Sequence, residues 1–390
     1  MTSHPNTCIA CGADDVQPVL SIERAPVLCN ELSHSRAEAL DAQVAPIELA
    51  HCATCGHFFN ATFDARRIVY GPDYENSLHF SPRFQDYSAS LVDSLSRRHE
   101  LGGSSVVEVG CGNGDFLRQL CAPTGASGYG FDPGYDGPEL VDDRVHLSAS
   151  SFFEATPVSE LGLLCCRHVL EHVEDPRKFV AGIAAKLRAD SGTALYMEVP
   201  NALYTLRDLG IWDIIYEHPS YFCVESLRSV VHAAGFGEIE VEETFGGQFL
   251  SLHAKLERSS PKASAANSLP ADMAKLVDQF ADAYRAKIEQ WKATLLEAKQ
   301  AGRKVAVWGA GSKGASFLNI VDPNSTVAFV IDVNPAKHGK FVAGTGHKIV
   351  APEALRESPV ETIILMNPLY EGEVRATLDS VNPAAALLLA

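Results

Sequence analysis

The sequence contains no apolar run of about 18 residues, the length that a membrane-spanning helix needs. Its first residues, MTSHPNTCIACG, lack the positive stretch and the following apolar stretch of a secretory signal. It also has no run of Lys and Arg, and its formal net charge is -17, whereas a nucleic-acid-binding surface generally needs positive charge. We therefore expect a soluble cytoplasmic protein with neither a membrane nor a nucleic acid as its partner.

The sequence has ten cysteines, which in a cytoplasmic chain are expected to be thiols or metal ligands rather than disulfides. Four of them form two Cys-x-x-Cys-Gly stretches, CIACG at 8–12 and CATCG at 52–56. Thiolates two residues apart can hold a tetrahedral zinc ion, and the glycine helps the turn to close. A four-thiolate site leaves no open position, so we expect a structural role; the alternative is four unrelated reduced thiols. The predicted ligands are Cys8, Cys11, Cys52 and Cys55, with Cys29, His51 and His57 as substitutes.

The length of 390 residues and the 46% hydrophobic content predict two or three domains with ample core. We place a zinc-binding domain in residues 1–80 and a domain of alternating strands and helices in residues 81–258. Residues 259–390 are predicted to hold a long helix and a second Rossmann-like unit. The first part of this last segment, SSPKASAANSLPAD at 259–272, is small, polar and rich in turn residues, which indicates a linker.

Residues 81–258 alternate between apolar runs of strand length and amphipathic helical patterns. This order predicts an α/β fold with a doubly wound parallel sheet. Residues 81–98 have helical spacing, with Ser81 as the N-cap. Apolar residues also recur at helical intervals from Met273 to Leu295, and we expect this stripe to face the core.

The stretch EVGCGNGDF ends a predicted strand with Glu108 and continues with Gly110, Gly112 and Gly114. Glycines at the carboxyl end of a strand allow a ligand to lie against bare backbone. Asp132 follows 22 residues after Gly110, at the end of the next predicted strand, where a carboxylate can accept hydrogen bonds from a ribose. An acid within the loop suits the cationic sulfonium of S-adenosylmethionine better than a pyrophosphate.

This segment resembles the class I methyltransferases, since VEVGCGNGDF is similar to their first motif and HVLEHVEDP at 168–176 to the segment after their fourth strand. The resemblance implies that Gly110 and Gly112 contact the methionine part of the donor and that Asp132 binds its ribose. Glu108 then orders the loop. For His168, Glu171 and His172 a structural role and a chemical role both remain open.

The three parts together resemble the nucleotide-sugar C-methyltransferases, which have a zinc-binding domain, a methyltransferase core and a carboxyl-terminal Rossmann-like unit in the same order. The resemblance covers essentially the whole chain. It implies a substrate that is a nucleotide-linked 4-keto-hexose, methylated at the carbon beside the ketone.

The stretch YEHPSYF at 216–222 resembles that family's motif Y-H-E-H-x-S-Y-F, although Tyr216 stands where the family has its first histidine. The resemblance implies that His218 is the base and Glu217 its partner. A base must remove the weakly acidic proton beside a ketone, and a donor such as Tyr216 or Tyr221 can stabilise the enolate oxygen. A carboxylate can also raise the pKa of a histidine or fix its tautomer. The alternative is that Tyr221 and Phe222 pack in the core and His218 is a loop residue.

The substrate-binding residues are less well defined. Gln248, in FGGQFLSLHA, stands where the family commonly has a small hydroxyl residue, and the basic residue that follows there is missing here. Tyr74, in DYENSLHFSP, is a candidate for the sugar-contacting tyrosine. These departures leave open another sugar, another position or a substrate that is not a sugar.

The carboxyl-terminal stretch GAGSKG matches a dinucleotide fingerprint, with Gly309, Gly311 and Gly314 after a predicted strand and Asp332 after the next one. NAD is therefore one expected ligand. The family resemblance implies instead that Gly309, Gly311 and Lys313 bind the substrate, and we favour the substrate diphosphate.

The leading interpretation is an enzyme that uses S-adenosylmethionine to methylate the carbon of a small-molecule keto sugar. Methylation of oxygen or nitrogen on another small natural product is an alternative. A catalytically inactive zinc-ribbon binding protein is a further alternative, from a different class.

Overall fold

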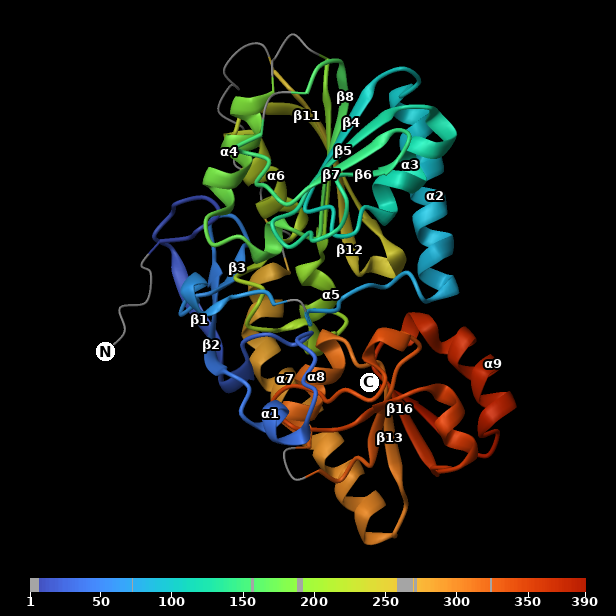
Figure 1. The fold of residues 1–390 in the computed structure, drawn as a ribbon. Coiled ribbons are helices and arrows are strands. Elements are labelled where there is room, and N and C mark those ends of the chain that lie inside the picture. The colour runs from blue at the N-terminus through green and yellow to red at the C-terminus, as the bar shows by residue number, and fades with distance from the viewer. Residues whose placement is uncertain are drawn as a thin grey trace.

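The computed structural model describes residues 7–71, 73–155, 158–187, 192–257, 269, 272–322 and 325–390. The predicted linker at 259–272 lies almost entirely outside these residues. Three sheets organise the chain, one for each predicted part (Figure 1). Within the described segments, no helix is both long and apolar enough to cross a membrane.

The amino-terminal sheet is antiparallel, and its fourth strand comes from a distant part of the chain. Its order is β1-β2-β3-β10. The tenth strand pairs with the third, Ser220 opposite Phe59, so the second half of YEHPSYF completes this sheet. A short helix, α1 (Arg36–Leu40), belongs to the connection that follows β1 and precedes β2 in the sequence. The strands are β1 (Val16–Pro26), β2 (Val44–Cys52), β3 (Phe58–Asn60) and β10 (Ser220–Tyr221).

The central sheet has eight strands in the order β11-β12-β9-β8-β4-β5-β7-β6. Five of them are mutually parallel: β4 (Ser105–Val109), β5 (Ser127–Phe131), β7 (Val145–Ser148), β8 (Leu161–Arg167) and β9 (Ala194–Pro200). The outer strands β6 (Leu140–Asp142), β11 (Phe236–Thr244) and β12 (Phe249–Leu256) pair antiparallel. The predicted parallel sheet is therefore confirmed at its centre and wrong at its edges, where β11 and β12 form a hairpin.

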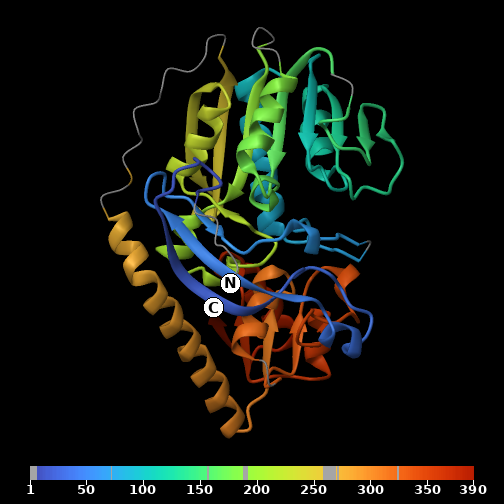
Figure 2. The same ribbon diagram turned by 90° about the vertical axis from the view of Figure 1, so that its left-hand side faces the viewer.

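Helices accompany this sheet on both sides (Figure 2). The predicted start of the first one is confirmed, because the Ser81 hydroxyl accepts a hydrogen bond from the Phe84 amide at 3.2 Å. The helices are α2 (Pro82–His99), α3 (Asp115–Thr124), α4 (Pro176–Lys186), α5 (Ala202–Leu206) and α6 (Val224–Ala233).

The carboxyl-terminal part begins with α7 (Met273–Gln300), which runs along the edge of the molecule (Figure 2). Its predicted apolar stripe is confirmed as core, since Val277, Phe280 and Trp291 are buried. An all-parallel sheet of order β15-β14-β13-β16-β17 follows, as a second Rossmann-like unit requires. Its elements are β13 (Val305–Trp308), α8 (Ser312–Val321), β14 (Phe329–Ile331), β15 (Ile349–Val350), β16 (Thr362–Leu365), α9 (Glu371–Val381) and β17 (Ala386–Leu389).

Single turns of 3-10 helix connect several elements: η1 (Ala65–Arg67), η2 (Leu170–His172), η3 (Ile211–Asp213), η4 (Phe245–Gly247), η5 (Pro335–Lys337), η6 (Pro352–Arg356) and η7 (Pro368–Tyr370).

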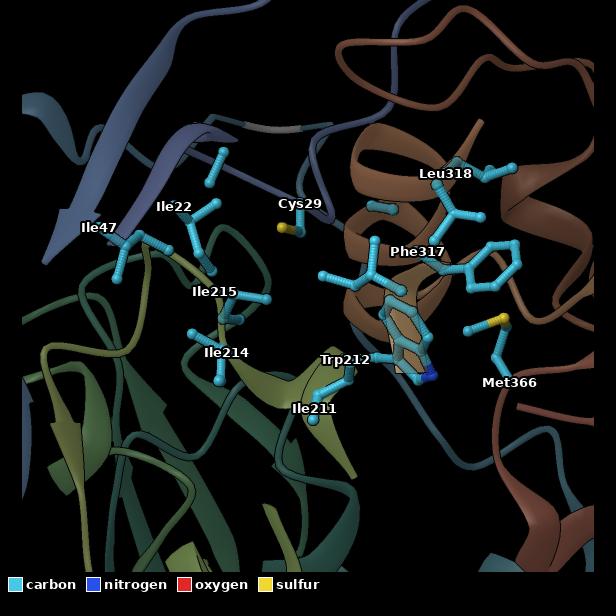
Figure 3. Close-up of a cluster of buried hydrophobic side chains, with 14 of the residues drawn as sticks. Ile22, Cys29, Ile47, Ile211, Trp212, Ile214, Ile215, Phe317, Leu318 and Met366 are labelled. Atoms are coloured by element: carbon cyan, nitrogen blue, oxygen red, sulfur yellow. The ribbon is translucent and has the colours of Figure 1, made fainter. Parts of the chain in front are cut away.

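One hydrophobic core is shared by all three parts of the chain (Figure 3). Apolar side chains from the amino-terminal sheet, from residues 211–215 and from α8 pack together in it, and each large one that is fully buried stabilises the fold by about 2 kcal/mol. The segment just before YEHPSYF is therefore fixed between two domains. The labelled members are Ile22, Cys29, Ile47, Ile211, Trp212, Ile214, Ile215, Phe317, Leu318 and Met366.

Candidate active site and metal centre

The two Cys-x-x-Cys-Gly stretches fold into matching turns. In each turn the amide of the first cysteine donates to the carbonyl five residues later, at 2.7 Å for Cys8 and 2.9 Å for Cys52. The glycine amide donates back to the carbonyl of that cysteine, at 2.8 Å in both turns. These glycines, Gly12 and Gly56, have φ values of 80° and 74°, which other residues rarely adopt. The repeated local sequence thus produces the same backbone shape twice.

The turns bring the four predicted thiols together. Cys8 Sγ lies 3.7 Å from Cys55 Sγ, and Cys11 Sγ lies 3.6 Å from Cys52 Sγ. All four sulfur atoms lie within 4.8 Å of one another, a spacing close to that of a tetrahedral thiolate site. The three substitutes do not join this group: Cys29 packs in the shared core, the His51 ring packs at a tilt on Phe58, and the His57 ring stacks on Phe59.

The first glycine loop follows β4 at the carboxyl edge of the central sheet. Gly110 has a φ of 73°, and a Cβ atom there would lie 2.1 Å from Val169 Cγ2. Beside Gly112, by contrast, a Cβ atom would meet nothing within 4 Å. Asp132, half-buried at the end of β5, accepts hydrogen bonds from the Gly112 amide at 2.9 Å and the Gly134 amide at 2.8 Å. The structure therefore brings the predicted donor-binding residues to one edge, and Gly114 begins the helix that follows.

Glu108 is buried beneath this loop, 3% exposed. Burial raises the pKa of its carboxyl group to about 8, since the attraction of Arg167 only partly offsets the loss of solvation. Its Oε2 atom has no hydrogen-bond partner within the described part of the chain. At pH 7 this buried carboxyl group is therefore mostly protonated.

A buried ionic network, which sequence reasoning missed, extends from this acid along the same edge. The Glu198 carboxylate accepts from the Arg167 guanidinium at 2.9 Å and pairs with His168 Nε2 at 2.9 Å. Burial would raise the pKa of Glu198, but these two cations hold it well below its usual range. Tyr87 and Tyr196 also donate to Glu198. The available signal was positional: Arg167 and Glu198 stand at the ends of adjacent parallel strands.

His168 continues this network toward a second cluster. Burial would lower the pKa of His168, but the carboxylates of Glu171 and Glu198 outweigh it and raise the pKa to about 9. His168 Nδ1 lies 3.5 Å from Glu171 Oε1. Ligand atoms of Glu171, His172 and His218 lie within 4.8 Å of one another, so the candidate base faces two residues of the HVLEHVEDP stretch.

Among the described residues, none forms a hydrogen bond with the ring of His218. It packs edge-on against His172, with 4.7 Å between ring centroids, and its Nδ1 atom is buried with no partner in the described structure. Burial, and then the charges of His172, His168 and Lys313, hold the pKa of His218 well below its usual range. The imidazole is therefore neutral at pH 7. A carboxylate partner would have raised the pKa of His218, whereas the protein lowers it.

Glu217 points away from His218. Its Oε2 atom accepts a hydrogen bond from the Cys29 amide at 3.0 Å, and burial raises the pKa of its carboxyl group. Tyr74 lies beside it: burial, and then the charge of Glu217, raise the pKa of the Tyr74 phenol well above its usual range. Among the described residues, no hydrogen bond or ion pair joins Glu217 to His218. Tyr74 is therefore a neighbour of Glu217, whereas the Glu217 carboxyl group does not contact the imidazole of His218.

The two tyrosines of YEHPSYF are engaged in the protein interior. The Tyr216 hydroxyl accepts a hydrogen bond from the Asp64 amide at 3.0 Å, and its ring packs on Phe63. The Tyr221 hydroxyl donates to the Ile215 carbonyl at 3.0 Å and accepts from the Ile215 amide at 3.2 Å. Both side chains are buried, and neither hydroxyl joins the cluster around His218.

The remaining candidate residues lie between the central and carboxyl-terminal parts. The Gln248 amide exchanges two hydrogen bonds with Asn367, at 2.8 and 3.0 Å. The Lys313 ammonium pairs with the Asp213 carboxylate and lies 5.3 Å from the ring centroid of Tyr204. Gly309 directly follows β13 and has a φ of 111°, and Gly311 is the N-cap of α8. Gln248 and Lys313 thus join two parts of the protein.

Two family models match the chain in succession. A methyltransferase domain matches residues 82–241, and a C-methyltransferase C-terminal domain matches residues 247–387. The C-methyltransferase NovU of Streptomyces niveus is 24% identical over 406 aligned residues, which cover 94% of this chain and 90% of the relative. The chain belongs to the C-methyltransferase family. It is an S-adenosylmethionine-dependent methyltransferase with a class I methyltransferase fold.

Shorter stretches of the chain are similar to other methyltransferases. The ubiquinone biosynthesis O-methyltransferase of Aromatoleum aromaticum (strain DSM 19018 / LMG 30748 / EbN1) is 27% identical over 126 residues, which cover 30% of this chain and 52% of the relative. A SAM dependent methyltransferase from Archaeoglobus fulgidus of known structure is 20% identical, with a TM-score of 0.35, over 43% of this chain and 94% of that chain.

Proposed function

We propose that this C-methyltransferase methylates the carbon beside the ketone of a nucleotide-linked keto sugar, with His218 as the base. The observation that carries the proposal is the buried, unpartnered Nδ1 atom of His218 near the carboxyl edge of the sheet. A lone pair without a competing hydrogen bond is what proton removal needs. Membership of the family, which extends over the carboxyl-terminal unit, supports carbon rather than oxygen as the methylated atom.

The low pKa of His218 fits this role at neutral pH. Because burial and neighbouring positive charge keep the imidazole neutral, it does not have to lose a proton before it accepts one. The developing enolate would be stabilised by a nearby donor, and Tyr74 is the candidate, since its phenol stays protonated beside Glu217. Tyr221 is a less suitable donor because its hydroxyl already donates to the Ile215 carbonyl, and Tyr216 is less suitable because its hydroxyl lies at the Asp64 amide, outside the cluster around His218.

The residues at the first glycine loop fit the methyl donor, which supplies an electrophilic methyl group when it is bound. Asp132 would accept from the ribose hydroxyls, the backbone at Gly110 and Gly112 would line the methionine part, and buried Glu108 would support the loop. The open space beside Gly112 agrees with a ligand that lies against the backbone here.

We also propose that Cys8, Cys11, Cys52 and Cys55 hold a structural zinc ion. The turns orient four thiols toward one point, and three of these cysteines are buried. Four neutral thiols would not stabilise the fold much by lying so close together, whereas a tetrahedral zinc ion needs four sulfur atoms around one point. Metal analysis of the purified protein should find about one zinc per chain, and a Cys52→Ser variant should lose it. Wild-type protein free of zinc would refute this assignment.

The test of the base is hydrogen exchange at the substrate carbon, measured in deuterated water by mass spectrometry or NMR with a nucleotide 4-keto-sugar. His218→Ala and His218→Gln should abolish exchange and methyl transfer while still binding S-adenosylmethionine in calorimetry. His232→Ala is the matched control, because the ring of His232 makes no hydrogen bond or ion pair among the described residues and lies on α6. Undiminished exchange in both His218 variants would remove His218 from the mechanism.

A further inference from the structure

A cluster of three possible metal ligands is formed by Glu171, His172 and His218. The proposed reaction uses only His218. The first two residues belong to η2, directly after the last residues of β8, and the third belongs to the loop that η3 and β10 enclose. One possible ligand atom from each residue lies within 4.8 Å of the other two. Glu171 is only 2% exposed, so its carboxylate is a costly feature unless something satisfies it.

Glu171 and His172 each have one polar atom engaged and another free, and His218 has a free ring nitrogen. His172 Nδ1 lies 3.0 Å from the Glu217 carbonyl oxygen, so it donates there and leaves Nε2 with a lone pair. Glu171 Oε1 faces His168, whereas Oε2 is buried with no partner in the part of the chain that the structure describes. His218 Nδ1 is likewise buried, with no hydrogen-bond partner among the described residues.

This pattern matches a prepared metal site. Two imidazoles and one carboxylate with open positions beside them form a common ligand set for divalent first-row transition metals. A metal-binding histidine usually donates its second ring nitrogen to a carbonyl or carboxylate, as His172 does with Glu217, and a metal-binding carboxylate is usually held by a second contact, as Glu171 is by His168.

We propose that Glu171, His172 and His218 bind a divalent transition-metal ion and that this ion inhibits the enzyme. The second half rests on the proposed function, because a lone pair that coordinates a metal ion is not available to accept a proton. Metal binding and proton abstraction therefore compete for one histidine. The cluster is a second site, separate from the four cysteines, and its ligands are nitrogen and oxygen rather than sulfur.

The binding test uses zinc-loaded full-length protein titrated with Co²⁺, followed by calorimetry and visible absorption. We expect one Co²⁺ per chain, without the cobalt–thiolate bands that replacement of zinc at the cysteines would produce. Glu171→Gln, which preserves size, and His172→Ala should each weaken Co²⁺ binding by at least about tenfold. His232→Ala should bind as the wild type does. Unchanged affinity in both ligand variants, or no additional Co²⁺ in the wild type, would overturn the proposal.

Inhibition is measured separately, as the effect of Co²⁺ on hydrogen exchange at the substrate carbon. Saturating Co²⁺ should suppress exchange at least about tenfold, and an excess of chelator should restore it. Bound Co²⁺ without suppression would refute the inhibitory half. If His218→Ala abolishes exchange but Co²⁺ does not bind, the metal site is wrong and the base remains. If Co²⁺ binds but His218→Ala exchanges normally, the base and the inhibition are wrong and the site remains.

Discussion

The protein contains two glycine loops of similar local geometry, one in each Rossmann-like unit. Gly110 and Gly309 each follow a parallel strand with positive φ, and an aspartate at the end of the next strand accepts an amide hydrogen bond from each loop. Asp132 accepts from Gly112 at 2.9 Å, and Asp332 accepts from Ala310 at 2.8 Å. The sequence fingerprints therefore describe the same backbone arrangement.

The surroundings of the two loops differ. Two residues before the first glycine, the core has the buried acid Glu108, whereas the carboxyl-terminal unit has the buried apolar Val307. The second loop is also occupied by protein groups, since Lys337 donates to the Ala310 carbonyl at 3.3 Å and Lys313 pairs with Asp213. A glycine fingerprint thus specifies a backbone shape, and the side chains around it decide whether a cationic ligand or a neighbouring domain lies there.

The largest expected difference between the loops is steric. A Cβ atom at Gly314 would lie 2.0 Å from the Gly309 carbonyl oxygen, a backbone atom, whereas one at Gly112 would meet nothing within 4 Å. Gly314→Ala should therefore destabilise the protein by about 3 kcal/mol, and Gly112→Ala by about 1 kcal/mol because of its positive φ. Urea unfolding measures both. Equal losses would show that the two loops are packed alike.

The next effect concerns the two aspartates. Asp132→Ala should weaken S-adenosylmethionine binding by about 2 kcal/mol, or roughly 30-fold, because charge-assisted hydrogen bonds to the ribose are lost. Asp332→Ala should leave that affinity unchanged within about twofold. Isothermal titration calorimetry with the methyl donor checks this, and thermal unfolding shows whether each variant is folded. An equal loss of affinity in Asp332→Ala would contradict the division of roles.

A smaller effect is expected at the junction beside the second loop. Lys313 and Asp213 are mostly buried, with 19% and 18% of their side chains exposed. Lys313→Met should destabilise the fold by about 1–2 kcal/mol by leaving the carboxylate unpaired. A double-mutant cycle with Asp213→Asn isolates the pair. The single variant should also weaken binding of a nucleoside diphosphate but not of S-adenosylmethionine; a loss of both would contradict a substrate role for this loop.

A separate effect, measured as a slope against pH rather than as a single difference, is the pH response of Glu108. Its pKa is about 8 in the folded protein because of burial, above the usual value of 4.5 in the unfolded chain. The unfolded chain therefore releases this proton first, and stability falls as the pH rises from about 4.5 to 8. Glu108→Gln should reduce the slope of the unfolding free energy over this range, measured by urea unfolding at several pH values. An unchanged slope would show that Glu108 is ionised in the fold.

Local features were predictable because their causes are local. The repeated Cys-x-x-Cys-Gly stretches produce the same turn twice, Ser81 caps its helix, and the apolar stripe from Met273 to Leu295 faces the core. The parallel centre of the central sheet followed from alternating patterns, but its antiparallel hairpin did not. Apolar runs specify strands and not their direction when both faces are covered.

The site could be predicted only in part. The residues predicted to bind the methyl donor stand at strand ends, where sequence position implies location. The network of Arg167, Glu198 and His168 joins three places along the chain, and no local pattern predicts such pairing. Likewise, Glu217 and His218 are adjacent in a turn but have different partners, Cys29 and His172, which distant parts of the chain bring there.

The sequence by itself therefore determined the two Rossmann-like units, the cysteine turns and the glycine loop for the methyl donor, since each depends on neighbours within a few residues. Only the tertiary structure decided that Tyr216 and Tyr221 are engaged with backbone groups, that Lys313 is paired, and that His218 faces Glu171 and His172. The physical reason is that burial and pairing of a polar group depend on the segments packed around it. In YEHPSYF those segments come from all three parts of the chain.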